Sequence, residues 1–229
     1  MTSATPLTVD IWSDIACPWC YVGKRRFEEG LATFSAANPE TPVDVRFHSF
    51  ELSPDTPVDF DGTEVDFLAE YKGMPRAQVV GMLEQMTQTA ESVGLHYDYD
   101  ALQHTNTVKA HQLLHWAEAQ GRQADMKERL LRAYFVEGRH VGRAEDLADL
   151  AAELGLDRAD ALAALEEDRY LAAVRADQQQ AQAYGIQGVP FYVIDGRYGV
   201  SGAQEPAAFA EVLGQVAVER VAEPVGAAE

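Results

Sequence analysis

Four residues, Cys17-Pro18-Trp19-Cys20, hold both cysteines of this 229-residue chain and decide which fold we expect. Two cysteines are too few for a disulfide scaffold, and a chain this long can bury a sizeable core without one. Two intervening residues place both sulfurs on one helical turn, close enough to bond to each other. The spacing therefore predicts redox chemistry or metal binding rather than a structural bridge.

The residues around this motif predict a strand before it and a helix after it. Apolar and polar residues alternate from Leu7 to Trp12, as in a strand, and residues 21–34 carry an apolar side at helical spacing. Alternation returns at 43–48, so the first 50 residues are expected to form a β-α-β unit. The cysteines then lie where the first strand passes into the helix.

A position at the start of this helix gives each cysteine a different role. The partial positive charge of a helix N-terminus favours a thiolate, and Pro18 suits the first turn because its missing N–H needs no partner. We expect Cys17 to be the exposed nucleophile and Cys20, one turn inside, to be the resolving thiol. Asp14 would oppose the thiolate, whereas the basic residues 24–25 would support it if they folded back, and both effects stay open.

A helical block follows, because apolar residues recur at spacings of three and four through much of residues 53–168. The elements expected after this block are strands at 191–194 and 197–200, a hairpin turn at Asp195-Gly196, a closing helix from Pro206 to about Val216 and a frayed tail at 219–229. The chain is thus expected to run β-α-β, helical block, helix, β-β-α.

A second motif, Gly188-Val189-Pro190-Phe191, opens the first of those late strands. Proline cannot donate a hydrogen bond inside a sheet, so its place there needs a reason. X-Pro bonds adopt the cis form far more readily than other peptide bonds, and a cis proline is usually retained for function. An ordinary trans proline at the start of a strand is the alternative, and this stretch alone leaves both open.

Both motifs together resemble the thioredoxin fold, and the helical block between its two halves is similar to that of the DsbA family. The stretches SDIACPWCYVG, 13–23, and GIQGVP, 185–190, are most similar to the FrnE-like branch, which groups with 2-hydroxychromene-2-carboxylate isomerases and kappa-class glutathione transferases. The resemblance implies an α/β, thioredoxin-like fold with a large helical insertion. Its implied parts are a thioredoxin-like domain, 7–52 plus 169–218, and an inserted helical domain, 53–168.

The resemblance also implies a function and the residues that carry it. It indicates a thiol-disulfide oxidoreductase that acts on protein or small-molecule disulfides, with a cis proline opposite the cysteine pair. No cofactor beyond the redox-active pair is expected, and glutathione stays open as a co-substrate. The implied site residues are Cys17, Cys20 and Pro190 for catalysis, and Pro18, Trp19 and Val189 for substrate contacts.

Two departures from the family's patterns bear on the chemistry. Trp19 stands where the secreted oxidants have His, so no imidazolium lies beside Cys17, and we expect a potential between about −270 and about −180 mV. The isomerase and kappa-transferase branches usually carry Ser at the nucleophile position, whereas this chain keeps both thiols. Dithiol–disulfide exchange is therefore expected, with a glutathione-dependent isomerase or transferase of the kappa type as the alternative, and a binding module without turnover as a third reading.

A metal site is the alternative interpretation of the two cysteines. His111 and His115 lie four residues apart on a predicted helix, and together with both cysteines they would make a Cys2His2 zinc set. The loop between the two pairs is far longer than in a zinc finger, and Gln112 replaces the glutamate that a zinc protease needs as its base. We therefore expect no metal, with one histidine packed against the core and the other solvated.

Charge and composition narrow the range of partners. Lysine and arginine total 18 against 37 acidic residues, a net charge of −19 that repels nucleic acid and anionic lipid. The longest apolar run, 189–194, is far shorter than the ~18 residues of a spanning helix, and residues 1–14 lack the pattern of a secretory signal. We expect a cytoplasmic protein with neither nucleic acid nor membrane as a partner, and a homodimer stays open.

Overall fold

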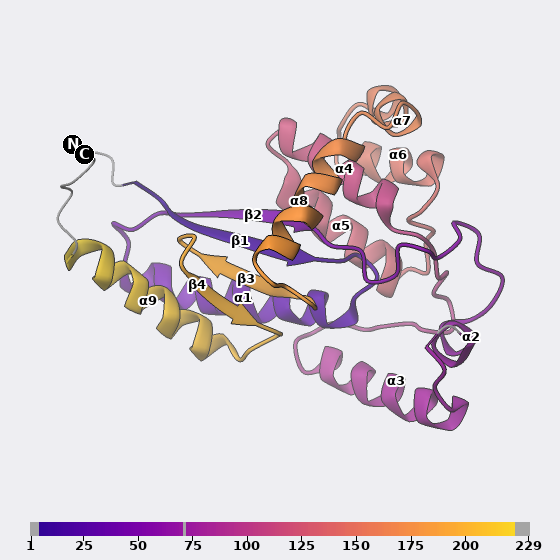
Figure 1. The fold of residues 1–229 in the computed structure, drawn as a ribbon, viewed down its shortest axis with the longest axis horizontal. Coiled ribbons are helices and arrows are strands. Elements are labelled where there is room, and N and C mark those ends of the chain that lie inside the picture. The colour runs from indigo at the N-terminus through magenta and orange to yellow at the C-terminus, as the bar shows by residue number, and fades with distance from the viewer. Residues whose placement is uncertain (1–4, 71, 223–229) are drawn as a thin grey trace.

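The arrangement of strands and helices comes from a computed structural model that describes residues 5–70 and 72–222 (Figure 1). Its elements, in chain order, are β1 (Leu7–Ser13), α1 (Pro18–Ala37), β2 (Val43–Ser49), α2 (Glu64–Glu70), α3 (Arg76–Glu91), α4 (Val108–Ala119), α5 (Gln123–Phe135), α6 (Ala144–Glu153), α7 (Arg158–Glu166), α8 (Leu171–Ala183), β3 (Phe191–Ile194), β4 (Tyr198–Ser201) and α9 (Pro206–Ala222). This order confirms the predicted α/β fold with a helical insertion.

Strand β1 is an inner strand of a four-stranded mixed sheet with the order β2-β1-β3-β4. It runs parallel to β2, with Leu7 opposite Val43, and antiparallel to β3. Helix α1 is the crossover that a parallel pair requires, because it returns the chain to the end of the sheet where β1 began. The β3–β4 hairpin turns at Asp195 and Gly196, whose φ angles of 55° and 67° are those of the predicted tight turn.

Alternation along β1 divides its side chains between the two faces of the sheet. Leu7, Val9 and Ile11 pack against α1 and α9, which lie together on one face (Figure 1). Trp12 packs on the other face with residues of α8, and its indole N–H donates to the Asp177 carbonyl at 3.0 Å. Helices therefore cover both faces of β1 and hold the end of the strand where the cysteine motif begins.

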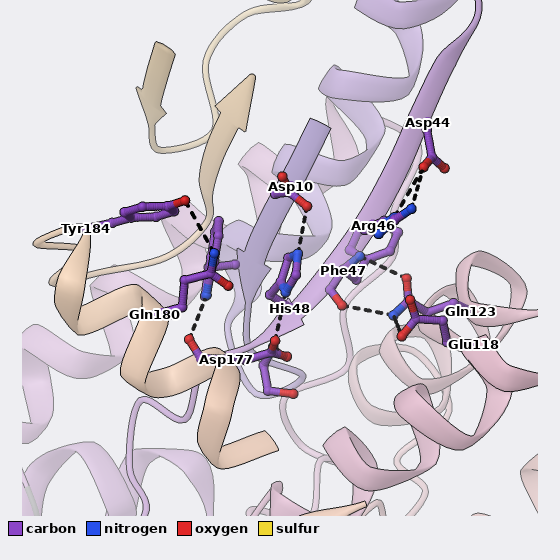
Figure 2. Close-up of polar contacts among 12 residues, drawn as sticks. Asp10, Asp44, Arg46, Phe47, His48, Glu118, Gln123, Asp177, Gln180 and Tyr184 are labelled. Atoms are coloured by element: carbon purple, nitrogen blue, oxygen red, sulfur yellow. Dashed lines mark hydrogen bonds and ion pairs between the residues drawn. The ribbon is translucent and has the colours of Figure 1, made fainter. Parts of the chain in front are cut away.

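Helices α2 to α7 lie between β2 and α8 in the chain and form the inserted helical part. Its apolar core is continuous with α1, since Tyr21 and Val22 pack in the same cluster as residues of α4, α5 and α6. Helix α5 is also bound to the sheet, because the Gln123 side chain bonds both the N–H and the C=O of Phe47 at 2.9 Å (Figure 2). The insertion is thus fastened to the helix that carries the cysteines.

The closing helix α9 is longer than the sequence predicts. It continues past Val216 and includes 219–222, where a frayed tail is expected, while 223–229 lie outside the described residues. A long-range ion pair explains the extra turn, because Arg220 reaches Asp195 of the β3–β4 hairpin at 3.2 Å. Across residues 5–70 and 72–222, no helix is long and apolar enough to cross a membrane.

Candidate active site

The cysteine motif lies at the junction of β1 and α1. Cys17 is the N-cap residue of α1, with an extended backbone of φ −96° and ψ 111°, and Pro18 is the first helical residue. Cys20 belongs to the first turn, where its N–H donates to the Cys17 carbonyl at 3.0 Å. Both cysteines are free thiols. Local sequence explains this geometry, since proline at the first position of a helix has no N–H that needs a partner.

The exposure of the two cysteines corrects the prediction that Cys17 is open to solvent. Cys17 is 4% exposed, and Cys20 is 3% exposed. Distant segments cover the motif: the Cys17 thiol donates to the Val189 carbonyl at 3.5 Å, and the Tyr97 hydroxyl donates to the Pro18 carbonyl at 2.7 Å. Exposure therefore does not distinguish the nucleophile from the resolving thiol.

Pro190 lies against α1 beside the cysteine motif. The Val189–Pro190 peptide bond is cis, and the Pro190 carbonyl accepts a hydrogen bond from the Gly202 N–H at 2.9 Å. This close approach requires a glycine in the helix, because a Cβ at Gly23 would lie 2.9 Å from Pro190 Cγ and 2.7 Å from Tyr192 Oη. The structure thus brings the proline segment into direct contact with the helix that carries both thiols.

Burial and nearby charge govern the Cys20 thiol. Burial raises its pKa well above the ordinary value, and the adjacent Cys17 raises it further. The positive charge of Lys127 and the backbone N–H of Asp14 act in the opposite direction. Cys20 is therefore a thiol at neutral pH and must lose its proton before it can attack a disulfide.

Asp14 is a buried carboxylate that ties the cysteine loop to its surroundings. It accepts hydrogen bonds from the backbone N–H groups of Ile15 at 2.7 Å and Leu52 at 2.8 Å, and from Thr107 at 2.8 Å and His111 at 3.2 Å. Burial alone would raise its pKa, but His111 and the other donors outweigh burial and hold the pKa below its ordinary value. The carboxylate thus joins the loop before α1 to α4 and to the segment after β2.

The basic residues that follow the motif are paired away from it. Lys24 bonds Glu28 at 2.6 Å and Glu128 at 2.7 Å, and Arg25 contacts Glu128 at 2.5 Å. Tyr21 also donates to Glu128, at 2.6 Å. These contacts fasten α1 to α5, and they leave both cations neutralised by carboxylates rather than directed at the helix start.

A pocket of about 380 Å³ lies beside the motif and has the size of a small-ligand site. Pro18 and Trp19 line it, and Trp19 is 46% exposed. Its apolar walls come from α2 and α3 and include Phe67, Leu68, Leu83 and Met86. One buried polar pair also borders the pocket, His104 and Glu64, 2.6 Å apart. Two of the three predicted substrate-contacting residues therefore border a space that can hold a ligand.

Comparison with known proteins assigns the chain to a family. Residues 8–214 match the family model described as the DSBA-like thioredoxin domain. The chain belongs to this family. A probable DsbA oxidoreductase from Streptomyces coelicolor is 38% identical, with a TM-score of 0.87 over 97% of this chain and 94% of that chain. The motif at the start of α1 is therefore that of a DsbA-like enzyme of the thiol-disulfide type.

Two more distant solved structures share the DSBA-like fold. The cytosolic disulfide reductase DsbM from Pseudomonas aeruginosa, solved with GSH, has a TM-score of 0.67 at 23% identity, over 93% of this chain and 100% of that chain. A 2-hydroxychromene-2-carboxylate isomerase has a TM-score of 0.68 at 14% identity, over 94% of this chain and 98% of that chain. At these identities the likeness is one of fold.

The two histidines considered as metal ligands have other partners in this DSBA-like chain. His111 is fully buried and contacts Asp14, whereas His115 contacts Asp177 at 3.0 Å and Ser49 at 3.2 Å. His115 is thus largely covered by α8 and β2, which corrects the prediction that one histidine is solvated. Within the ranges that the structure describes, no group of three or more His, Cys, Asp or Glu side chains is placed to hold a metal ion.

No sequence motif pointed to Lys127, the buried lysine whose positive charge opposes the rise in the pKa of Cys20. One signal could have found it, because Gln123 and Lys127 occupy core positions of the helical stripe that contains Met126 and Leu130. A lysine at such a position is rarely buried without a reason. Asp14 and Tyr97 offered no comparable signal, since their burial depends on segments far away in the chain.

Proposed function

We propose that the chain is a FrnE-like thiol-disulfide oxidoreductase that exchanges the Cys17–Cys20 dithiol with the disulfide of a substrate. One observation carries the proposal: Cys17 is the N-cap of α1, Cys20 lies in its first turn, and the Cys17 Sγ contacts the Val189 carbonyl at 3.5 Å. The unpaired N–H groups of a helix start favour negative charge on a sulfur placed there. A nucleophile, a second thiol and a backbone segment that can align a substrate are thus together.

The exchange balances with these two thiols alone. The Cys17 thiolate attacks one sulfur of the substrate disulfide, and the other substrate sulfur leaves as a thiolate. Cys20 then loses its proton and attacks Cys17, so that the mixed disulfide breaks and the Cys17–Cys20 bond forms. Two electrons pass from the cysteine pair to the substrate. The N-cap position of Cys17 and the raised pKa of Cys20 support this order of attack.

For the substrate we propose contacts with Val189, Pro18 and Trp19. An extended peptide can hydrogen-bond to the backbone at Val189 as an added strand would, and a small disulfide suits the pocket beside Trp19. Protein and small-molecule disulfides both fall within the proposal. Glutathione is proposed as a co-substrate, in keeping with the GSH in the DsbM structure, and we propose no other cofactor.

Trapping of mixed disulfides tests the roles of the two cysteines. Cys20→Ser should accumulate a covalent adduct with glutathione disulfide or with an unfolded disulfide-bonded protein, because the resolving thiol is gone. Cys17→Ser should trap neither substrate, and the wild type should turn both over. Mass spectrometry of non-reduced protein gives the readout. Equal trapping by both variants, or none by Cys20→Ser, would contradict the proposed roles.

A second candidate is a glutathione-dependent isomerase or transferase of the kappa type. The pocket with its Glu64–His104 pair favours it, because such a reaction needs a bound small electrophile next to the nucleophile. This activity would need one thiol only. Glutathione conjugation to an aryl chloride that persists in Cys20→Ser and disappears in Cys17→Ser would support the second candidate, whereas no conjugation in the wild type would eliminate it.

We further propose that the enzyme works as a reductant in the cytoplasm. Without an imidazolium beside Cys17, the potential should lie between about −270 and about −180 mV, so the pair would rest as a dithiol in a reducing compartment. Equilibration with glutathione redox buffers measures this, and a value near about −120 mV would contradict it. The charge of −19 argues against nucleic acid and membrane partners, and sedimentation equilibrium would decide whether a homodimer forms.

A further inference from the structure

Three polar side chains that line the pocket beside the cysteine motif each have an atom without a hydrogen-bond partner. Thr56 follows β2, and Tyr99 and His104 lie between α3 and α4. Thr56 Oγ1, Tyr99 Oη and His104 Nε2 are shielded from solvent, and none of them bonds another atom of the described residues. A buried polar atom without a partner costs free energy, so three of them around one pocket need an explanation.

Other hydroxyls in the wall of this pocket are bonded within the protein. Thr105 donates to the Val58 carbonyl at 2.7 Å, and Thr107 donates to Asp14 at 2.8 Å. These two threonines and Thr56 are all less than a tenth exposed. Burial in this wall does not by itself leave a hydroxyl unpaired, so the unbonded oxygen of Thr56 is specific to its position.

Contacts around His104 leave Nε2 as its unused ring nitrogen. Nδ1 lies 2.6 Å from a Glu64 oxygen and 3.3 Å from the Tyr134 hydroxyl, and the ring stacks on Phe67 with centroids 3.5 Å apart. A carboxylate at Nδ1 holds the ring proton there, so the neutral ring presents Nε2 as an acceptor. His104 is 5% exposed, and Glu64 and Phe67 line the pocket with it. The pocket wall therefore contains an imidazole whose orientation is fixed.

Together the three unpaired atoms match the hydrogen-bonding capacity of one hydroxyl group. A hydroxyl donates one hydrogen bond and accepts two. His104 Nε2 can accept that bond, and Tyr99 and Thr56 can each donate one from their own hydroxyls. A carbonyl would leave Nε2 without a donor, and a carboxylate would add negative charge beside Glu64 in a chain of net charge −19. The site therefore favours an uncharged hydroxyl on an apolar group.

The pocket also has an exposed apolar part next to the cysteine motif. Trp19, Leu52 and Met82 line it and are exposed. Pro18, which directly follows Cys17, lines it as well, and α2 and α3, which supply apolar wall residues, lie beside the start of α1 (Figure 1). Exposed apolar side chains around a cavity mark a site for a partner. Its place beside Cys17 indicates that the partner is the polypeptide segment whose cysteine Cys17 attacks.

We propose that this pocket binds the phenol ring of a tyrosine next to the reacting cysteine of a protein substrate. The inference rests on the dithiol exchange proposed above and names the disulfides that the exchange favours. The ring lies among the apolar side chains, and its hydroxyl donates to His104 Nε2. Tyr99 and Thr56 donate to the phenol oxygen. The tyrosine takes no part in the bond changes, which stay those of Cys17 and Cys20.

Single-turnover oxidation of the reduced protein by peptide disulfides tests this preference. The substrates are disulfide-linked dimers of Lys-Xaa-Cys-Xaa-Lys, blocked at both ends, in which Xaa is Tyr, Phe or Ala. Identical residues on both sides of the cysteine make the result independent of strand direction. Liquid chromatography of acid-quenched samples measures the released peptide thiol. We expect the Tyr peptide to react about 10-fold faster than the Phe peptide, because a Phe ring leaves the three polar atoms unpaired, and the Ala peptide to react most slowly.

Two variants remove the unpaired hydroxyls and keep the shapes of their side chains. Tyr99→Phe and Thr56→Val should each lower the preference for Tyr over Phe from about 10-fold to about threefold, and the double variant should lower it further. The loss should fall on the Tyr peptide. Thr33→Val is the matched control, because the Thr33 hydroxyl bonds the Glu29 carbonyl at 3.1 Å within α1, outside the pocket. This control should keep the wild-type preference.

Thermal unfolding distinguishes a binding role from a structural role. An unpaired hydroxyl stabilises nothing in the free protein, so Tyr99→Phe and Thr56→Val should melt at the wild-type temperature or above it. A lower melting temperature of both variants, or failure to fold, would show that the protein itself uses these hydroxyls and would overturn the inference.

Competition by p-cresol, the side chain of tyrosine, distinguishes a peptide from a free phenol. p-Cresol should compete with the Tyr peptide in the millimolar range, as expected for so small a ligand, and toluene should compete less well. Competition by micromolar p-cresol would indicate a site built for a free phenol and would overturn the assignment to a peptide.

The remaining outcomes separate the inference from the exchange on which it rests. Equal rates for the Tyr and Phe peptides in the wild type would show that water pairs with the three atoms and would overturn the inference. A preference for Tyr that survives in the double variant would overturn the assignment to these hydroxyls. Failure of the wild type to reduce any of the peptides would instead contradict the proposed exchange, and binding of p-cresol, followed by its NMR signals, would still report on the pocket.

Discussion

Two polar clusters adjoin the sheet, one partly buried and one fully buried, and they differ in how completely their groups are paired. The His48 cluster comprises His48, Asp10, Asp177 and His115. His48 lies between two carboxylates, 2.8 Å from Asp10 and 2.8 Å from Asp177 (Figure 2), and Asp177 also contacts His115 at 3.0 Å. Every ionisable side chain of this cluster therefore has an oppositely charged or hydrogen-bonding partner.

The cysteine cluster comprises Cys17, Cys20, Asp14, Lys127 and Tyr192. Asp14 is fully bound, but the Lys127 amine and the Tyr192 hydroxyl have no hydrogen-bond partner among the described residues. Unpaired buried polar groups cost free energy, and they concentrate at sites where a group must later accept a proton or a substrate. The His48 cluster thus supports the fold, whereas the unpaired groups beside the cysteines cost stability at the proposed site of disulfide exchange.

Removal of a carboxylate from the His48 cluster should have the largest effect on stability. Asp177→Ala leaves His48 with one carboxylate partner, removes the acceptor of the Ser49 N–H, and takes from His115 its nearest carboxylate, so that His115 keeps the Ser49 hydroxyl and Glu118. We expect the free energy of unfolding to fall by about 3–5 kcal/mol, as for other broken buried pairs. Urea denaturation measures the loss, and exchange per folded molecule should not change. A loss below about 1 kcal/mol, which is typical of exposed ion pairs, would show that the His48 cluster does not stabilise the fold as proposed.

The His48 cluster should also make stability fall at alkaline pH. Burial alone would lower the pKa of His48, but Asp10 and Asp177 raise it to about 9, above the 6.5 of an unfolded chain. The stabilisation is therefore complete below pH 6.5 and is lost as pH rises through 9, on the order of 3 kcal/mol in total. Unfolding curves between pH 6 and about 10 test this, and His48→Gln should flatten that slope.

The cysteine cluster should show the opposite pH dependence, with stability that rises as pH rises. Burial depresses the pKa of Lys127 from 10.5 to about 8, so its charged form destabilises the fold fully below pH 8 and the penalty disappears as pH rises to 10.5. Lys127→Met should therefore stabilise the protein by about 1–4 kcal/mol at pH 7, with the gain shrinking toward pH 10.5. A gain independent of pH would show that packing, not charge, is responsible.

A smaller effect should come from the contact between α1 and the Pro190 loop. A Cβ at Gly23 would meet Pro190 and Tyr192 within 2.9 Å, so Gly23→Ala should destabilise by about 1–3 kcal/mol and slow exchange. Gly81→Ala in α3 is the matched control, because no atom lies within 4 Å of its added Cβ, and it should stabilise by about 0.5–1 kcal/mol. If both variants changed the free energy of unfolding in the same direction, the clash with Pro190 and Tyr192 would not explain the effect of Gly23→Ala.

Much of the fold could be predicted from local patterns in the sequence. Alternation at 7–12 and 43–48, with a helix between them, predicted the parallel pair that the structure has as Leu7–Ser13 and Val43–Ser49, and Asp195-Gly196 predicted the hairpin. Pro18 marked the start of α1 and so placed Cys17 at its N-cap. These features were accessible because strand periodicity, turn conformation and helix starts depend on residues only a few positions apart.

Only the tertiary structure decided the environment of the thiols. The cover over Cys17 comes from Val189, 172 positions away, and the Asp14 carboxylate binds His111, 97 positions away. The same holds for Lys127, whose amine acts on Cys20 because α5 packs against α1. Exposure and pKa depend on which charges, donors and apolar groups come within a few ångströms, and for these thiols the groups come from segments that no local pattern joins.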